Sequence, residues 1–303
     1  MKPFIKWAGG KRWLVKKDDF SLPKFSGTYV EPFLGGGAVF FHTQPKKSIL
    51  SDVNPKLIGV YKAVRSDWES VTEHLAEMEK KHSKEYYYQE RGCTRLTDAE
   101  KAAQFLYLNR TCWNGLYREN LKGEFNVPIG TKTKVIFEDE DFSEISKILK
   151  NAELNTCDFE ETIDRAGEGD LVFADPPYTT AHNMNGFVKY NQKIFSWSDQ
   201  LRLKNAIERA IGRGATVVLT NADHESIHKL YEVCDFRKKT ISHKDDGGDL
   251  RFPIIVTLSL KEKHPQPHDR GCSYLRAQKL QSKSHQRHKA LLQIKPIRIH
   301  HLG

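Results

Sequence analysis

The sequence predicts an α/β fold, in which an open, doubly wound sheet is interrupted by a helical insertion. Two observations support this prediction. Strand and helix patterns alternate in residues 28–55 and again in residues 152–260, as expected for a mostly parallel sheet with helices on its faces. The intervening residues 56–150 have mostly helical patterns. We therefore expect residues 1–55 and 151–260 to form one discontinuous α/β domain around the insertion.

The first predicted elements lead into and out of a glycine turn. Residues 28–33, TYVEPF, read as a strand that runs into LGGGAVFF, a glycine turn that opens a short helix. The next strand-like segment, SIL, ends at Ser51 and Asp52. A helix is expected to begin at Pro55, because Asn54 is a suitable N-cap and proline is favoured at the first helical position.

The remaining elements are predicted from pattern and turn chemistry. Within the insertion, DWESVTEHLAEMEKKH and TDAEKAAQFLYLNRT have helical patterns. In the stretch NGLYRENLKGEFNVPIG, Asn120 to Gly123 separate GLYR from EFNV, which predicts a hairpin. After the insertion, the expected strands and helices are AELNTCDFEETI, DLVFADPPY, SDQLRLKNAIERAI, ATVVLTNADH, SIHKLYEV, DFRKKTIS and PIIVTLSL.

The amino-acid composition limits the classes of protein to which this chain can belong. The 303 residues, 38% of them apolar, can bury a substantial core. No run of 18 or more apolar residues is present, and the N-terminus is not a secretory signal, so we expect a cytoplasmic protein without a membrane partner. The five cysteines include no CxxC pair and no Cys/His cluster with metal spacing, so we expect reduced thiols and no metal site.

The net charge of +9 is concentrated at one end of the chain. Residues 261–303 contain ten Lys and Arg but only two Asp and Glu, and six of the 13 histidines. This segment has no clear helical or strand period, so we predict a basic, disordered tail. The rest of the chain is nearly neutral, and the total charge therefore says little about what the folded part binds.

Two segments near the N-terminus have the features of a ligand site. The turn in EPFLGGGAVF lacks the GxGxxG spacing, but its glycines still allow a ligand to approach backbone amides. Asp52, at the tip of the next strand, is placed to accept hydrogen bonds from a ribose diol. NAD sites, S-adenosylmethionine sites and ordinary turns all share this pair of features. In FIKWAGGKRWL, two glycines separate Trp7 from Lys11, which suggests a cation directed at a carboxylate-bearing ligand.

The sequence FADPPY places an acid at the end of a buried strand. Prolines 176 and 177 cannot continue the sheet, so Asp175 lies at the carboxyl edge, where ligands bind in open α/β sheets. The alternative is a strand that simply stops at a Pro-Pro turn, with Tyr178 packed in the core. An exocyclic adenine amine is a poor nucleophile, because its lone pair is delocalised into the ring. The Asp175 carboxylate and the Pro176 carbonyl, converging on its hydrogens, would localise that lone pair, and Tyr178 offers a stacking surface for a flipped-out base.

Residues 108–130, LNRTCWNGLYRENLKGEFNVPIG, interleave cationic, amide and aromatic side chains. Cationic and amide groups contact phosphates and base edges, and aromatic rings wedge or stack against bases. The alternative is a solvated hairpin with a packed tryptophan. The density of these side chains favours nucleic acid, and the candidate DNA contacts are Arg110, Trp113, Asn114, Arg118, Asn120 and Lys122.

Taken in order, several segments together resemble the DNA adenine methyltransferase (Dam-type) family over residues 1–260. The segments are PFIKWAGGKRWL, YVEPFLGGGAVFF, SDVNPKLI, LNRTCWNGLYRENLKGEFNVPIG, CDF, FADPPY, NGFVKYNQKIFSWSDQ and VVLTNADH. Members of this family transfer a methyl group from S-adenosylmethionine to adenine N6 in DNA. The resemblance implies a Rossmann-like S-adenosylmethionine methyltransferase sheet with a helical and hairpin DNA-recognition insertion at residues 56–150.

The resemblance also implies roles for individual residues. S-adenosylmethionine is the implied methyl donor, without a metal, and double-stranded DNA is the implied partner, with a cognate restriction nuclease as a further candidate. Arg118 would contact a guanine, and Trp113 would fill or prop open the duplex. Asn185 and Tyr190 are weaker candidates near the flipped base. The implied cofactor residues are Trp7, Lys11, Glu31, Phe33, Gly35, Asp52, Asp158, Phe159 and Asp175, and the implied catalytic residues are Asp175, Pro176 and Tyr178.

Three other functions compete with this interpretation. An NAD-dependent oxidoreductase would not explain FADPPY and would have the GxGxxG spacing. A catalytically decayed DNA-binding protein is suggested by the acidic residues in 244–249, where the family usually has basic ones, but every proposed chemical position holds a competent residue. A cytosine-N4 methyltransferase needs the same acceptors, but the order of the segments favours the adenine group. Similarity of the hairpin to GATC-reading enzymes makes GATC the first candidate site.

Overall fold

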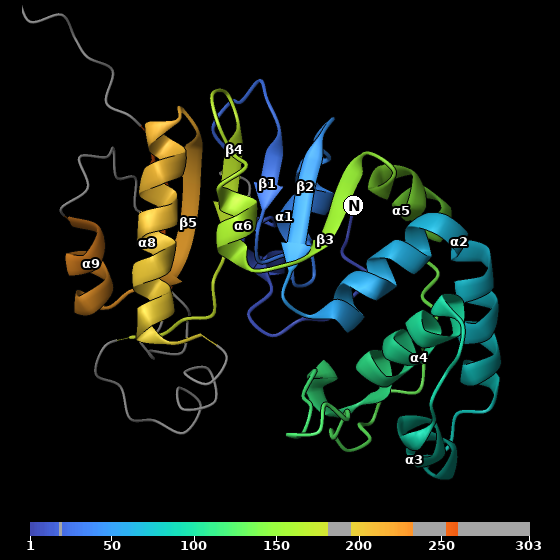
Figure 1. The fold of residues 1–303 in the computed structure, drawn as a ribbon. Coiled ribbons are helices and arrows are strands. Elements are labelled where there is room, and N and C mark those ends of the chain that lie inside the picture. The colour runs from blue at the N-terminus through green and yellow to red at the C-terminus, as the bar shows by residue number, and fades with distance from the viewer. Residues whose placement is uncertain (18–19, 181–194, 233–252, 260–303) are drawn as a thin grey trace, which may run out of the picture. The chain divides into compact units, whose positions relative to one another are not determined.

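A six-stranded sheet forms the centre of the computed structural model, which describes residues 1–17, 20–180, 195–232 and 253–259 (Figure 1). The strand order is β3-β2-β1-β4-β5-β6. All neighbouring strands are parallel except β5 and β6, which are antiparallel. The predicted α/β fold is thereby confirmed. The strands are β1 (Tyr29–Glu31), β2 (Ser48–Asp52), β3 (Ala152–Thr156), β4 (Leu171–Ala174), β5 (Thr216–Ala222) and β6 (Pro253–Leu258).

The strand order reverses direction between β1 and β4. Tyr29 of β1 pairs with Ser48 of β2 on one side and with Leu171 of β4 on the other. The chain therefore builds the sheet outward from β1 towards β3, and then outward from β4 on the opposite side. In open α/β sheets, such a reversal leaves a crevice at the carboxyl ends of the two central strands, where ligands bind. The residues that follow β1 and those that follow β4 meet at this edge.

The turn after β1 depends on glycine. Gly35 and Gly37 have φ of +48° and +64°, in the left-handed region that disfavours other residues. A Cβ on Gly35 would lie 2.7 Å from Cδ1 of Trp7, so the turn and the N-terminal segment approach too closely for any side chain. The turn leads into the short helix α1 (Ala38–Thr43).

The insertion between β2 and β3 is built from four helices in the described part of the chain. Helix α2 (Pro55–Lys80) begins as predicted, because the Asn54 side chain accepts the backbone N–H groups of Lys56 and Leu57. The helix is kinked at Asp67, whose φ of −152° and ψ of 64° are non-helical, and this is where the sequence predicted one helical segment to end and the next to begin. The others are α3 (Lys84–Gly92), α4 (Asp98–Thr111), which begins with a capping box of Thr97 and Glu100, and α5 (Phe142–Leu149).

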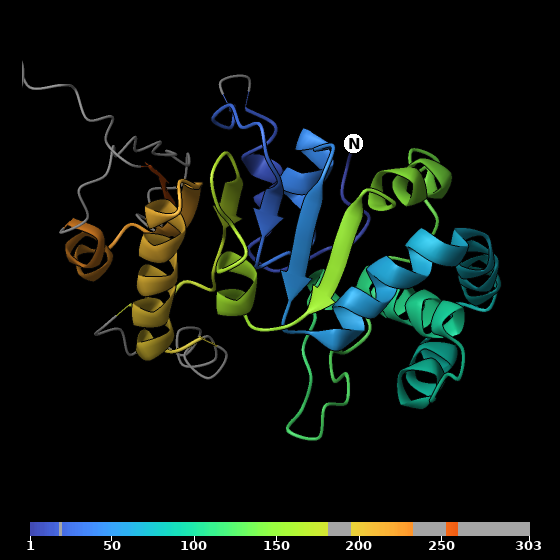
Figure 2. The same cartoon turned by 45° about the horizontal axis from the view of Figure 1, so that its top comes forward.

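The predicted hairpin follows α4 and a short 3-10 helix, η2 (Trp113–Gly115). Its turn lies where it was expected, with the Gly123 amide donating to the Asn120 carbonyl at 3.0 Å. The strand pairing between the two arms consists of the isolated bridges Cys112–Ile129 and Glu119–Phe125, so no regular ladder forms between them. Figures 1 and 2 show this hairpin projecting on the side of the sheet at which the parallel strands end.

Apolar side chains cover both faces of the sheet. Val30 and Val172 pack with α6 (Phe159–Ile163) and α8 (Trp197–Gly212), which lie in front of the sheet in Figure 1. Their neighbours in sequence, Tyr29 and Leu171, face the opposite side and belong to the cluster that includes α1, α2, α4 and α5. This alternation is the period of two expected for strands. Helix α9 (Glu225–Glu232) follows β5.

Several predictions fall outside the described residues. These are the strand DFRKKTIS, the loop with Asn185 and Tyr190, the acidic residues 244–249 and the tail 261–303. Among the described helices, none is long and apolar enough to span a bilayer.

Candidate active site

Asp175 lies at the centre of a buried polar cluster at the carboxyl edge of β4. Lys11, from the 3-10 helix η1 (Lys11–Trp13), places its Nζ 2.6 Å from the Asp175 carboxylate and is only 5% exposed. The same ammonium donates to the Gly9 carbonyl at 2.8 Å. Thr220 of β5 donates a hydrogen bond to Oδ1 of Asp175. Segments far apart in the sequence thus hold this carboxylate from two sides.

Tyr178 lies beside this ion pair. Its ring centroid is 5.0 Å from Nζ of Lys11, a distance suited to a cation–π contact. Its hydroxyl is buried and lies near the side chains of Asp175 and Thr220. Burial, together with the nearby Asp175 charge, raises the pKa of Tyr178 above its usual value, so the ring stays neutral.

Asp52 is fixed against the glycine turn at the end of β2. Its Oδ2 accepts the Gly35 amide and its Oδ1 accepts the Asn54 amide, both at 3.0 Å. Burial raises the pKa of Asp52, and the backbone donors act against that rise. Each carboxylate oxygen accepts one of these two backbone bonds and keeps a free lone pair, which is the capacity needed to accept hydroxyl groups of a ligand.

Trp7 lies between the glycine turn and the insertion. Its ring stacks on Tyr117, with centroids 5.3 Å apart and planes inclined by 25°, and it also lies parallel to Phe105. A cavity of about 230 Å³ opens beside it and is also lined by Gly36 and Asn114. The N-terminal segment, the glycine turn and the residues after α4 therefore share one surface.

Two aromatic rings and an acid meet at the start of α6. The rings of Phe33 and Phe159 stack with centroids 5.3 Å apart. Asp158 caps α6 through the Glu160 amide, and its carboxylate also accepts a hydrogen bond from Arg202 at 2.7 Å. The predicted positions after β1 and β3 are thus in contact, although the two phenylalanines are 126 positions apart in the sequence.

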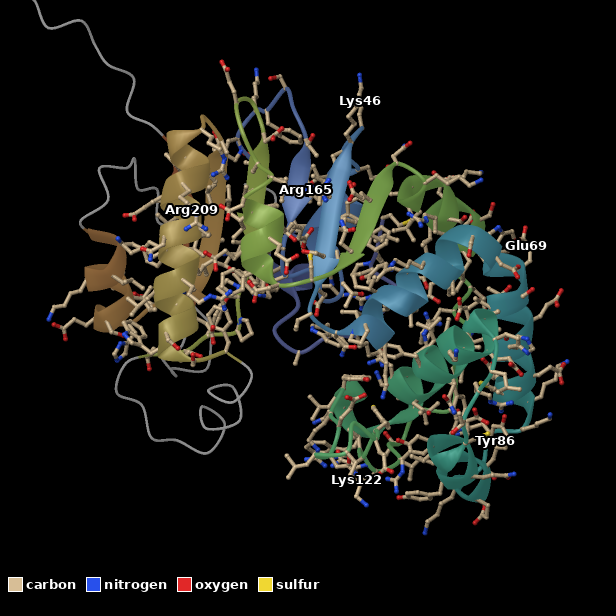
Figure 3. All side chains as sticks on the ribbon, viewed as in Figure 1. Lys46, Glu69, Tyr86, Lys122, Arg165 and Arg209 are labelled. Atoms are coloured by element: carbon tan, nitrogen blue, oxygen red, sulfur yellow. The ribbon has the colours of Figure 1, made fainter. Side chains whose placement is uncertain are left out.

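Most candidate DNA contacts are exposed around the hairpin. Trp113 is 53% exposed, and Asn114, also exposed, has a left-handed φ of 54°. The Arg118 guanidinium is held by Oδ1 of Asn126 at 2.8 Å across the two arms. Asn120 and Lys122 lie in the turn, and Figure 3 shows Lys122 at its outer end. Lys122 therefore lies on the side of the sheet on which the hairpin projects (Figures 1 and 3).

Arg110 is a correction to the predicted DNA contacts. It is 1% exposed and forms a paired contact with Glu140, with N–O distances of 2.7 and 2.9 Å. The guanidinium also donates to the carbonyls of Phe4 and Val135. A guanidinium held in this way has no route to a phosphate or a base, so its role is to tie α4 to the N-terminal segment and to the loop before α5.

Comparison with known proteins identifies the family. The model of the D12 class N6 adenine-specific DNA methyltransferases matches residues 7–245. The chain belongs to this family. It is 35% identical to the type II methyltransferase M1.LlaDCHI of Lactococcus lactis subsp. cremoris, over 85% of this chain and 95% of that protein. It is 36% identical to the type II methyltransferase M.MjaIII of Methanocaldococcus jannaschii, over 78% and 90%, and 33% identical to a DNA adenine methylase of Salmonella typhi, over 86% and 95%.

The resemblance to adenine methyltransferases drawn from the sequence is confirmed, and this methyltransferase acts on adenine in DNA as an enzyme of the D12 class. Its family implies S-adenosylmethionine as the methyl donor. No group of three or more His, Cys, Asp or Glu side chains that could hold a metal occurs in the part of the chain described by the structure.

Two residues that contact the candidate site were not predicted from the sequence. Thr220 lies in the quoted segment VVLTNADH, but its bond to Asp175 becomes visible only when β5 is placed next to β4. Arg202 lies on α8 and contacts Asp158, Glu160 and Asp199. For Thr220, the sequence showed a hydroxyl residue near the end of a predicted strand. It did not show the order of the strands in the sheet, which places Thr220 beside Asp175.

Glu31 of the methyltransferase is an acid with an unusual environment. It ends β1, is buried, and accepts a hydrogen bond from the Tyr29 hydroxyl at 2.7 Å. Burial raises the pKa of Glu31 to about 8; the Tyr29 hydrogen bond acts against this rise and the Asp175 charge adds to it. The carboxyl is therefore largely protonated at neutral pH, which limits the repulsion between the two acids.

This shift predicts a dependence of stability on pH. The folded-state pKa lies above the usual 4.5, so the stabilising contribution of protonated Glu31 is complete below pH 4.5 and is lost as pH rises to about 8. Relative to Glu31→Gln, which mimics the protonated acid, we expect the free energy of unfolding of the wild type to fall by up to about 1.4 kcal/mol per pH unit across this window. Urea unfolding of both proteins at several pH values measures the difference, and a difference that does not vary with pH would contradict the buried, protonated state.

Proposed function

We propose that this methyltransferase transfers the methyl group of S-adenosylmethionine to N6 of an adenine in duplex DNA, within the sequence GATC, after the target base has turned out of the helix. One observation carries the proposal. The Asp175 carboxylate is held by Lys11 and Thr220 beside the Tyr178 ring, at the point where the strand order reverses and next to the glycine turn. Residues 1–55 and 151–260 would form the catalytic domain, and residues 56–150 would recognise the target.

The residues around the glycine turn fit S-adenosylmethionine. Of the three N–H groups on Lys11, two are used by Asp175 and Gly9, which leaves one for the carboxylate of the donor. Free lone pairs on Asp52 suit the ribose hydroxyls. The assigned set is Trp7 and Lys11 at the amino-acid end, Asp52 at the ribose, Glu31, Phe33 and Gly35 along the wall, and Asp158 and Phe159 at the adenine, with Asp175 between donor and target.

The chemistry assigned to the protein is mainly positioning. The bound donor supplies an electrophilic methyl group on a sulfonium. The Asp175 carboxylate and the Pro176 carbonyl accept the hydrogens of the adenine amine, which localises the nitrogen lone pair. Tyr178 stacks on the base, and its neutral, half-buried ring supports this role. Holding the reacting atoms in line removes much of the entropic barrier.

DNA contacts are assigned to the exposed residues around the hairpin. Trp113 would fill or prop open the duplex, and Arg118 would contact a guanine. Asn114 and Asn120 would contact bases or phosphates, and Lys122 would contact a phosphate. Arg110 is no longer in this set. Two relatives are named type II methyltransferases, which makes a restriction nuclease of the same sequence specificity the further partner that we propose. The proposed location is on DNA in the cytoplasm.

Arg118→Ala tests the guanine contact. A bidentate arginine–guanine pair contributes about 1–3 kcal/mol of discrimination, so we expect a loss of about 10- to 100-fold in affinity for a GATC duplex and little loss for a duplex without the site. Lys122→Ala is the matched control, because loss of a phosphate contact weakens binding to both duplexes equally. Fluorescence anisotropy with the two duplexes measures these affinities. Equal weakening by Arg118→Ala on both duplexes would show that Arg118 contacts only the backbone.

Methyl transfer from radiolabelled S-adenosylmethionine tests the proposed function as a whole. Two duplexes that differ only in one GATC site are incubated with the protein and then digested to nucleosides. We expect label in N6-methyladenine from the GATC duplex alone. Label in both duplexes would reject GATC specificity, and label in a cytosine derivative would reject the target base. Label in neither duplex, with the donor still bound, would point first to another target sequence and then to a DNA-binding protein without activity.

A further inference from the structure

The end of β5 supports the loop that follows β4 from two directions. Thr220 and its neighbour Asn221 are both fully buried. Successive residues of a strand point to opposite faces, so these two side chains cannot serve the same partner. The Thr220 hydroxyl donates to Oδ1 of Asp175, at the start of the loop.

Asn221 reaches Thr179, four positions after Asp175, through Gln200 of α8. Its Nδ2 donates to Oε1 of Gln200 at 3.1 Å, and Nε2 of Gln200 lies 3.4 Å from the carbonyl of Thr179. Thr179 in turn donates its hydroxyl to the Phe195 carbonyl at 2.6 Å. The segment from Asp175 to Thr179 is therefore tied at its beginning and at its end to two adjacent residues of one buried strand.

We propose that Thr220 is a positioning residue for methyl transfer, which sets the orientation of the Asp175 carboxylate towards the target amine. This inference rests on the proposed role of Asp175. Lys11 alone would not define which way each carboxylate oxygen points, because its Nζ lies 2.6 Å from both oxygens and does not distinguish them. A second donor on a different side defines its plane. Threonine suits this task, because its β-branched side chain on a strand has few rotamers and its buried hydroxyl needs a partner.

The position of the hydroxyl also determines which lone pairs remain available. Thr220 donates to Oδ1, whereas Nζ of Lys11 donates to Oδ2 and lies 2.6 Å from both oxygens, so the carboxylate as a whole keeps unused acceptor sites. With the plane of the carboxylate fixed, one of these sites faces the amine hydrogen in every molecule. Without Thr220, only a fraction of molecules would hold the carboxylate in the reactive orientation. The loss should therefore appear in kcat and leave the binding of donor and DNA intact.

The substitutions Thr220→Val and Thr220→Ser distinguish the effect of the hydroxyl from the effect of side-chain packing. Valine keeps the volume and removes the donor, whereas serine keeps the donor and removes a methyl group. For Thr220→Val, we expect kcat for N6-methyladenine formation to fall about 10- to 100-fold, as for the loss of one hydrogen bond to a charged group, with KM for S-adenosylmethionine and DNA within about twofold of the wild type. For Thr220→Ser, we expect kcat within about threefold of the wild type.

Crystal structures of the two variants give a readout that does not depend on activity. We expect the Asp175 carboxylate to rotate away from its wild-type orientation in Thr220→Val and to keep it in Thr220→Ser. The proposal would be overturned if the carboxylate in Thr220→Val were unrotated and kcat were unchanged. It would also be overturned if kcat fell as far in Thr220→Ser as in Thr220→Val, because the loss of packing would then explain the effect. Absence of N6-methyladenine with the wild-type protein would instead contradict the proposed function, and the crystal structures would still decide what orients Asp175.

Discussion

Asp175→Asn is expected to lower kcat for N6-methyladenine formation by about 10²- to 10³-fold, the cost typical of removing one oriented electrostatic group from an active site. Asparagine keeps the shape of the side chain but replaces a carboxylate oxygen with an NH₂ donor. That NH₂ group cannot accept the hydrogen bond of the Lys11 ammonium, which is a donor only, nor the one that the Thr220 hydroxyl donates in the wild type. It also has no lone pair for the hydrogens of the target amine. Initial rates at saturating donor and DNA measure this effect.

Two controls make the result for Asp175→Asn specific. Asp139→Asn removes a carboxylate from an exposed ion pair with Lys2 and should leave kcat unchanged. Calorimetric titration with S-adenosylmethionine checks that the Asp175 variant still binds the donor. If Asp175→Asn kept more than about a tenth of the wild-type kcat, Asp175 would not be the acceptor of the amine hydrogens.

Arg110→Met is expected to reduce the free energy of unfolding by about 3–5 kcal/mol, the usual cost of removing one partner of a buried ion pair. The change leaves the Glu140 carboxylate without its paired contact and the carbonyls of Phe4 and Val135 without the arginine donor. It also removes a guanidinium packed 5.1 Å from the Phe137 ring centroid. Urea unfolding monitored by circular dichroism measures the loss.

Lys122→Met is the matched control for Arg110→Met, because it removes a cation at the exposed turn of the hairpin. We expect this control to weaken DNA binding and to leave the free energy of unfolding within about 0.5 kcal/mol of the wild type. Arg110→Met, assayed well below its unfolding temperature, should bind DNA as the wild type does. Weaker DNA binding with unchanged stability would restore Arg110 to the DNA contacts.

Local signals in the sequence were sufficient where a few adjacent residues determine the structure. Asn54 and Pro55 define the start of α2, because a cap and a fixed φ act within one turn of helix. The turn at Gly123 was predictable for the same reason. The position of Asp175 at a strand end followed from two prolines that cannot continue a ladder.

Contacts across the sheet and between distant segments could not be predicted in this way. In the sequence, Arg110 is a cation next to amide and aromatic residues, as expected for a DNA contact. Only its pairing with Glu140, 30 residues later, reveals a structural role. The bond between Thr220 and Asp175 depends on β5 lying next to β4, which no local pattern specifies. The raised pKa of Glu31 likewise depends on burial and on the nearby Asp175. These two acids are more than a hundred residues apart in the sequence.

A crystal structure of the chain with a non-reactive analogue of S-adenosylmethionine and a GATC duplex tests most directly whether one site holds both donor and target. We expect the amino-acid end of the analogue at Trp7 and Lys11, its ribose at Asp52, and the flipped adenine on Tyr178 with N6 hydrogen-bonded to Asp175. An analogue bound away from the glycine turn, or an adenine still stacked in the duplex in the closed complex, would contradict the placement of methyl transfer at the junction of β1 and β4.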